Sequence, residues 1–339
     1  MKTKLLSKAN ILSISFVMLT ATVFGQKLYP IEKNGKHGYI NDKGTEVVKT
    51  QYDNAKKFSE NMAAVKKNGM FGYIDENGSM VIQPKYALAR EFSEGLAAVK
   101  KDGKWVYIDK SGEVKINLNC HYAYKFSEGF ARFQRGQKLG YINKQGKEIV
   151  APVYDGAYDF QNGLARIKVG NKYGYINTSG AVAIEAKYAD AWDFEEGMAN
   201  VQVSDTKNGK WGFIDKTGKM VIEAKFDRAW HFSNDRALVR VGPFKTAVYG
   251  YIDKAGKYVI EPQFTAAFNF EDGLAAFSID KGSHKKYGFI DTSGKVVIDR
   301  EYIYPNTFNN GLCKVIKIVG SKKSIMFINT EGKSVWKLN

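Results

Sequence analysis

The 339-residue sequence is poor in cysteine and proline, with 2 Cys and 6 Pro, and it has no stretch rich in Gly and Ser or in Pro. Two cysteines are too few for a disulfide scaffold. The length alone would allow two domains, but the lack of a linker-like stretch leaves no obvious boundary between them. An aromatic content of 14% excludes a disordered chain.

Long apolar runs are also missing after the N-terminus. Three lysines among the first eight residues precede an apolar stretch over 11–24, and Gly25 supplies a small residue at a cleavage position. This run of about 14 residues is shorter than the roughly 20 that a membrane-spanning helix needs. We therefore expect residues 1–25 to be a signal peptide and residues 26–339 to be one exported domain without a transmembrane segment. Its location would be the periplasm, the outer surface or the extracellular space.

Arginine is scarce among the basic residues. Only 8 of the 51 are Arg, although the basic residues outnumber the 35 acidic ones and give a formal charge of +16. Lysine suits solubility and the protection of strand edges, whereas nucleic-acid-binding proteins add Arg in a localised stripe. We therefore expect no nucleic acid among the partners, and attraction to an anionic polymer of the cell envelope stays an alternative.

Motifs of catalysis and metal binding are missing as well. The sequence has no Gly-x-Ser-x-Gly, His-Glu-x-x-His, Walker loop or Cys-x-x-Cys, and its 4 histidines fall at unrelated positions of the repeat described next. We expect no catalytic residue, no metal and no cofactor. An enzyme whose site has no recognisable motif is an open alternative.

What the sequence does contain is a repeat that runs from residue 37 to the end. The motif aromatic-Gly-aromatic-Ile-Asx-x-x-Gly occurs nine times, and its last glycine recurs every 34 and later every 38 residues. These glycines are Gly44, Gly78, Gly112, Gly146, Gly180, Gly218, Gly256, Gly294 and Gly332. A second motif, Phe-x-x-Gly-Leu-Ala-x-Val, occurs eight times between them, for example at 92–99.

This pattern resembles the WG repeat family of bacterial tandem β-repeats, over about residues 33–339. Only Trp211-Gly212 spells the dipeptide that names the family, and the other units place another apolar residue or His there. The resemblance implies an all-β array and no defined biochemical activity.

Each unit should form a meander of three short strands. Adjacent Tyr and Ile in the first strand demand burial on both faces, which is typical of a central strand. The Asx and the Gly three residues later fit a tight turn. The Gly of the second motif is replaced only by Asn61 and Asp235, which tolerate a left-handed backbone, so we expect a positive φ at this position.

A unit of this size cannot bury its own apolar face, so stacking must complete the core. The sequence therefore predicts an all-β tandem array of about 34–38-residue three-stranded repeats, with about eight full units and a terminal hairpin. Because both ends of the array carry the same two strands, they do not complement one another. We expect an open, curved or superhelical stack, and a closed propeller-like ring is the alternative.

The two cysteines occupy different positions of the repeat. Cys313 stands where seven other units have Ala, which indicates a small buried residue. Cys120 aligns with Tyr86 and Tyr154 of neighbouring units. We expect no disulfide between them.

The best candidates for binding form a column two residues before the Phe of the second motif. Five consecutive units place an aromatic residue there, and we call this set the aromatic ladder: Tyr124, Tyr158, Trp192, Trp230 and Phe268. Such rings could stack on sugars or hold a peptide, because Tyr and Trp combine a large contact area with a polar group. The alternative is that they pack against the neighbouring unit.

The leading hypothesis is an exported, non-enzymatic scaffold that binds protein or glycan at the bacterial envelope. The first alternative is a polysaccharide or polyanion binder that uses the aromatic ladder and surface lysines. The second is an enzyme without a known motif. The oligomeric state stays open.

Overall fold

The computed structural model describes residues 27–205, 209–282, 285–320 and 322–338. The signal peptide expected at residues 1–25 lies outside this part. The described residues form β-strands joined by turns. No helix among them is long and apolar enough to cross a membrane.

The strands divide into nine consecutive units. In units 1 to 5 they are β1 (Leu28–Lys33), β2 (Lys36–Asn41) and β3 (Glu46–Tyr52); β4 (Asn54–Ala55), β5 (Met62–Lys67), β6 (Met70–Asp75) and β7 (Met80–Tyr86); β8 (Leu88–Ala89), β9 (Ala97–Lys101), β10 (Lys104–Ile108) and β11 (Val114–Leu118); β12 (Tyr122–Ser127), β13 (Phe130–Arg135), β14 (Lys138–Asn143) and β15 (Glu148–Tyr154); β16 (Gly156–Ala157), β17 (Leu164–Val169), β18 (Lys172–Asn177) and β19 (Val182–Tyr188). In units 6 to 9 they are β20 (Asp190–Ala191), β21 (Ala199–Gln202), β22 (Trp211–Ile214) and β23 (Met220–Phe226); β24 (Arg228–Ser233), β25 (Arg236–Val241), β26 (Val248–Ile252) and β27 (Tyr258–Phe264); β28 (Ala266–Ala267), β29 (Leu274–Ser278), β30 (Tyr287–Asp291) and β31 (Val296–Pro305); β32 (Leu312–Val319), β33 (Lys322–Asn329) and β34 (Ser334–Leu338).

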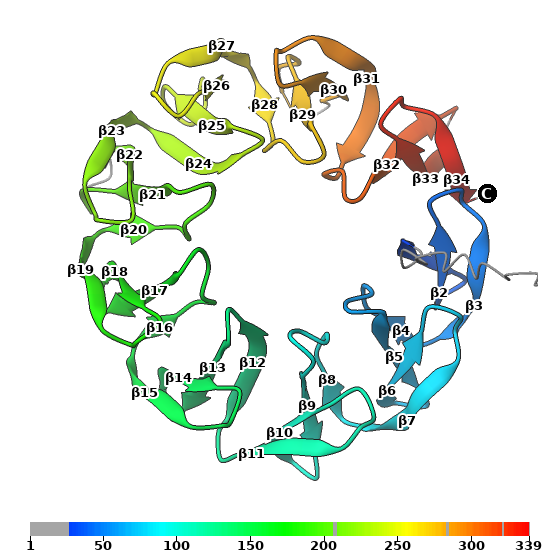
Figure 1. The fold of residues 1–339 in the computed structure, drawn as a ribbon. Helices are drawn as coiled ribbons and strands as arrows, with labels where there is room; N and C mark the ends of the chain where they lie inside the picture. The colour runs from blue at the N-terminus through cyan, green and yellow to red at the C-terminus, as the bar shows by residue number, and fades with distance from the viewer. Residues whose placement is uncertain (1–26, 206–208, 283–284, 321, 339) are drawn as a thin grey trace, which may run out of the picture.

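Each unit is an antiparallel sheet whose strands follow chain order. Unit 1 has three strands and units 2 to 7 have four, while β31 pairs with both β30 and β32 and so joins units 8 and 9 into one seven-stranded sheet. The units stand side by side around a ring, with strands such as β7, β15 and β23 on the outer rim (Figure 1). The all-β array of β-meander repeats predicted from the sequence is confirmed.

The predicted turn and the predicted left-handed position are both present. In unit 5, Oδ1 of Asn177 accepts the N–H groups of Ser179 and Ala181 at 3.0 and 3.1 Å. In the second motif, Asn61 and Asp235 have φ values of 66° and 59°, close to the values of the glycines that they replace. These substitutions therefore satisfy a backbone requirement.

Stacking between units completes the core, as the sequence predicts. Tyr175 of the central strand β18 is fully buried, and its hydroxyl donates to the carbonyl oxygen of Trp192 in the next unit at 2.6 Å. Its ring also packs against Phe194 of that unit, with ring centroids 4.9 Å apart. Units 1 to 8 all make this contact between a central-strand ring and the next Phe, so each of these interfaces between units is a separate small core.

A glycine in the central strand coincides with a bulge in the strand beside it. In seven units the strand that follows the central strand has two extra residues here, as shown by the pairs Tyr173–Tyr188 and Tyr175–Ile184. Units 3 and 9 have no such extra residues and carry Val106 and Met326 in place of the glycine. The glycine is therefore needed only where the bulged backbone comes close.

The predicted alignment of Cys120 with the tyrosines of neighbouring units is wrong, because unit 3 lacks the bulge. Because β11 is two residues shorter, Leu118 pairs with Trp105, in the way that Tyr154 pairs with Leu139 in unit 4. Leu118 thus takes the place of the tyrosine, and Cys120 lies in the bend that follows. Cys313 is buried at the alanine position, as expected, and both cysteines are free.

The first and last units are in contact, so of the two arrangements considered, the ring rather than the open stack is formed. The hydroxyl of Tyr29 donates to the carbonyl oxygen of Asn310 at 2.7 Å, and its ring lies 6.1 Å from that of Phe327. Both rings share an apolar cluster with Ile40 and Trp336. Figure 1 shows β34 of unit 9 beside unit 1. The ends do not complement each other as strands of one sheet, which was the reason to expect an open stack. Side-chain packing closes the ring instead.

The second motif forms a loop that follows the first strand of units 2 to 8. These loops, after β4, β8, β16, β20 and β28 among others, reach toward the middle of the ring (Figure 1), and we call them the inner loops. Unit 9 has the equivalent loop between β31 and β32. The described part of unit 1 begins after this position.

Candidate functional site

The aromatic ladder lies at the inner strands of five adjacent units. Each ladder residue directly follows an alanine of the first strand of its unit. A backbone hydrogen bond to the next strand holds it in place; for example, the N–H of Trp192 donates to Asn200 O at 3.0 Å. Tyr124, Tyr158 and Trp230 are half-buried, while Trp192 and Phe268 are each 36% exposed. The rings are thus neither sealed between units nor fully exposed.

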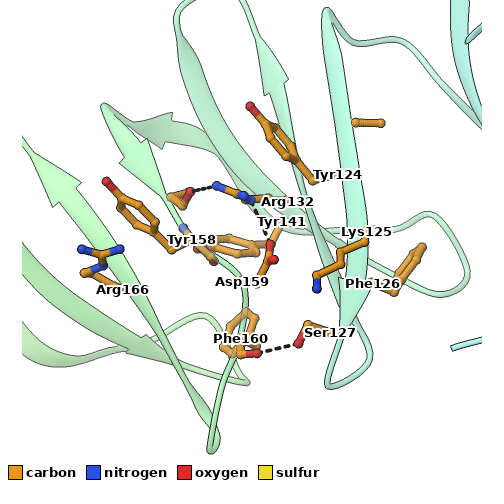
Figure 2. A network of polar contacts seen from close by, with 12 residues as sticks. Tyr124, Lys125, Phe126, Ser127, Arg132, Tyr141, Tyr158, Asp159, Phe160 and Arg166 are labelled. Carbon is orange, nitrogen blue, oxygen red and sulfur yellow. Dashed lines mark hydrogen bonds and ion pairs between the residues drawn. The ribbon is translucent and has the colours of Figure 1, made fainter. Parts of the chain in front are cut away.

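Two arginines alternate with the first three rings. The guanidinium carbon of Arg132 lies 4.0 Å from the ring centroid of Tyr124, and that of Arg166 lies 3.5 Å from Tyr158 (Figure 2). Arg132 is also 5.9 Å from Tyr158, and Arg166 is 5.7 Å from Trp192. We call this series, from Tyr124 to Trp192, the arginine–aromatic stack. Cation–π attraction makes it one continuous stack across units 4, 5 and 6.

Each arginine is anchored in the unit that follows its own. Arg132 donates to the carbonyl oxygen of Ala157 at 2.7 Å and pairs with Asp159 at 2.9 Å (Figure 2). Arg166, which is only 8% exposed, donates to Ala191 O and pairs with Asp193 at 3.0 Å. Burial raises the pKa of Asp193, and the charge of Arg166 opposes this rise. These two arginines therefore hold the units together as well as the rings.

The last two rings of the ladder are not part of this stack. Trp230 packs against Tyr249 and Phe268 packs against Tyr287, each with centroids 5.9 Å apart. Asn200 of unit 6 and Leu238 of unit 7 occupy the arginine position, opposite the central-strand aromatic. Among the described residues, no ring or cation contact joins Trp192 to Trp230. The structure thus brings three ladder residues together and leaves two apart.

A basic pocket of about 180 Å³ opens at the Tyr124 end of the stack. It is lined by four cationic residues, two acidic residues and the first ring of the stack: Lys56, Arg90, Lys125, Arg132, Glu91, Asp159 and Tyr124. The guanidinium carbon of Arg90 lies 4.9 Å from the Tyr124 ring. Burial, and then repulsion by Arg90, lowers the pKa of Lys56. Such a pocket favours an anionic group that could neutralise the excess of cations.

The sequence contained a signal for this pocket. Lys56 and Arg90 stand in the same column as the five rings, in the two units that precede them. Because they are charged and not aromatic, they are not part of the aromatic ladder predicted from the sequence. The structure places both in the pocket with Tyr124, the first ring of the ladder. Arg132 and Arg166 were missed because only two units carry arginine at that position.

Metal-binding clusters and a reactive Cys313 thiol are absent from the described part of the chain. Residues 27–205, 209–282, 285–320 and 322–338 contain no cluster of three or more His, Cys, Asp or Glu side chains that could hold a metal ion. Burial raises the pKa of the Cys313 thiol to about 12, so it stays protonated near neutral pH.

These features define a closed ring of β-sheet repeats that carries a stack of rings and cations on its inner strands. The chain belongs to the family described as WG containing repeat, which matches residues 38–70, 71–105, 107–138, 140–173, 173–206, 211–242, 249–282 and 287–317. The membership suggested by the nine sequence motifs is thus confirmed. No curated protein sequence matches the chain.

Solved structures of low sequence identity resemble parts of the ring. Hsv2p of Kluyveromyces lactis is 9% identical over 84% of this chain and 96% of its own, with a TM-score of 0.42. The β-propeller domain of the Trilobed protease from Pyrococcus furiosus, described as having an open velcro topology, is 11% identical over 91% and 97%, with a TM-score of 0.40. A quinonprotein alcohol dehydrogenase-like protein from Bacteroides thetaiotaomicron is 10% identical over 82% and 81%, with a TM-score of 0.36. At these TM-scores the similarities carry no argument about this chain.

Proposed function

We propose that this protein is an exported, non-enzymatic scaffold of the bacterial envelope that binds an acidic glycan. The observation that carries the proposal is the arginine–aromatic stack, which runs across three units and ends at a pocket with four cations. Aromatic faces and edges suit the apolar faces of sugar rings. Lysine and arginine in the pocket suit a carboxylate or sulfate group.

The remaining parts of the proposal have separate supports. Export is supported by the three lysines and the apolar stretch of the first 25 residues. A non-enzymatic role is supported by membership in a family of β-repeat scaffolds and by units that are nearly equivalent to one another. A glycan is favoured over nucleic acid because arginine is confined to a few positions and most of the positive charge is lysine.

Titration with polygalacturonate and heparin oligosaccharides, with neutral dextran for comparison, tests the proposal by isothermal calorimetry. We expect the acidic glycans to bind and dextran not to bind, with an affinity that falls as salt is added. Trp192→Ala removes one ring of the stack and should weaken binding about tenfold, in line with the loss of an aromatic contact. Lys56→Gln in the basic pocket should weaken it as well.

Phe268→Ala is the matched control. Phe268 has the same place in the repeat and the same 36% exposure as Trp192, but it lies outside the stack. This variant should bind as the wild type does. Equal losses for Trp192→Ala and Phe268→Ala, or no binding of any acidic glycan, would refute the stack as the binding site.

A further inference from the structure

A second pocket among the described residues lies where the ring closes. It has a volume of about 640 Å³ and is bordered by units 9, 1 and 2. Unit 9 contributes Asn309 and Asn310, unit 2 contributes Phe58 and Asn61, and unit 1 contributes the start of β1 from Lys27. This is the place in the ring where the inner loop of unit 1 would stand.

The other inner loops show which hydrogen bonds an inner loop makes with its two neighbours. The loop of unit 3 accepts a hydrogen bond from Ser59 of unit 2 at Phe92 O, at 2.7 Å, and donates its Gly95 N–H to Glu60 of unit 2 at 3.0 Å. Its own Ser93 and Glu94 hold the loop of unit 4 in the same way. Contacts of this kind link the inner loops of units 2 to 9 one after another.

At the closing point these groups have no counterpart among the described residues. Asn309 and Asn310 stand at the positions of Ser93 and Glu94, on one wall of the pocket. Phe58 O and the N–H of Asn61 stand at the positions of Phe92 O and Gly95 N–H, on the other wall. No hydrogen bond from a described residue reaches either of these two backbone groups. The walls therefore present donors and acceptors for one more inner loop, which the described residues do not supply.

Among the described residues, Tyr29 replaces the apolar part of such a loop, whereas its polar turn has no counterpart. Tyr29 covers Phe327, the ring on which a Phe of the next inner loop would pack. Lys27, Lys57 and Lys314 line the pocket, together with Glu60 and Glu76. Glu60 is already bonded to Lys110 and to Gly95 N–H. The pocket is therefore net positive and suits an acidic segment.

We propose that this pocket is a docking site for an acidic turn of a partner protein, of the Ser-Glu-Gly kind that the ring uses in its own inner loops. The serine hydroxyl of the partner would donate to Phe58 O, and its glutamate would accept the N–H of Asn61. Asn310 would accept the N–H of the glycine. The partner turn thus completes the circle of inner loops, and the site is independent of the arginine–aromatic stack.

A head-to-tail cyclised, fluorescein-labelled peptide with the sequence of residues 88–100 of this chain is the probe, and fluorescence anisotropy with the exported full chain is the readout. We expect saturable binding below about 1 mM. Glu94→Lys in the peptide, or Lys57→Glu in the protein, should weaken it about tenfold. Lys216→Glu, an exposed lysine in a distant turn, is the matched control and should leave binding unchanged.

Two results would overturn the proposal. One is the absence of saturable binding, or equal binding of the Glu94→Lys peptide. The other concerns the residues before Lys27: Phe24 precedes Leu28 by four residues, as Phe92 precedes Leu96. If a chain that begins at Lys27 binds the peptide and a chain that begins at Thr20 does not, the occupant is the N-terminal segment of the chain itself and not a partner. Trp192→Ala should not affect this assay, so it is separate from the test of glycan binding.

Discussion

Gly174→Val is expected to lower the free energy of unfolding by about 3 kcal/mol or more, in the upper range for overpacked sites. A Cβ atom at Gly174 would lie 2.5 Å from the carbonyl oxygen of Ile184 and 2.6 Å from the backbone nitrogen of Ala186. Both atoms belong to the bulged strand β19, which cannot withdraw without breaking its pairing with β18. Urea unfolding followed by circular dichroism measures the loss.

Val106→Ala in unit 3 is the matched control for this prediction. Val106 occupies the same place in the central strand, but the strand beside it has no extra residues. Its truncation to Ala should cost only about 1–2 kcal/mol, from the apolar burial lost with two carbon atoms. If both variants lose the same stability, the bulge is not the reason for the glycine.

Arg166→Met is expected to cost about 3 kcal/mol, the typical loss when one partner of a buried ion pair is removed. The arginine is 8% exposed and pairs with Asp193 at 3.0 Å, so the substitution leaves a half-buried carboxylate without its cation. The variant also loses the cation–π contact with Tyr158. Adding Asp193→Asn should restore at least half of the stability, because the amide carries no charge.

The pH dependence of this variant provides a second readout. Burial raises the pKa of Asp193 above its unfolded value, so the ionised form destabilises the folded state and the protonated form does not. Without Arg166 the pKa should rise further. The deficit of Arg166→Met relative to the wild type should therefore shrink as the pH falls from 7 toward the unfolded pKa of about 4. A deficit that is constant over this range would show that lost packing, and not the unpaired charge, explains the variant.

Features that recur in every unit could be predicted from the sequence. The Asx turn at Asn177, the left-handed position at Asn61 and the stacking through Tyr175 each follow from a column of similar residues. A column of equivalent positions shows which residue type is kept in all units despite differences between single units. They therefore report what the backbone and the core of every unit require.

Features that belong to one or two units could not be predicted in this way. Ring closure depends on Tyr29, which stands where seven other units have Ala and which contacts Asn310 and Phe327 of the last unit. The arginine–aromatic stack depends on Arg132 and Arg166, each of which reaches into the following unit. The alignment of Cys120 with Tyr86 and Tyr154 was wrong because β11 of unit 3 is two residues shorter than the equivalent strands of the neighbouring units.

The distance between the two ends of the array tests the closed ring most directly. Spin labels at Lys43 and Lys337, both exposed, would report it by double electron–electron resonance in a background with Cys120→Ala and Cys313→Ala. Gly44 is in contact with the backbone of Val335, so the ring predicts a single distance below about 30 Å once the label arms are included. An open stack of nine sheets about 10 Å apart would instead give a distance well above about 50 Å, and that result would contradict the ring.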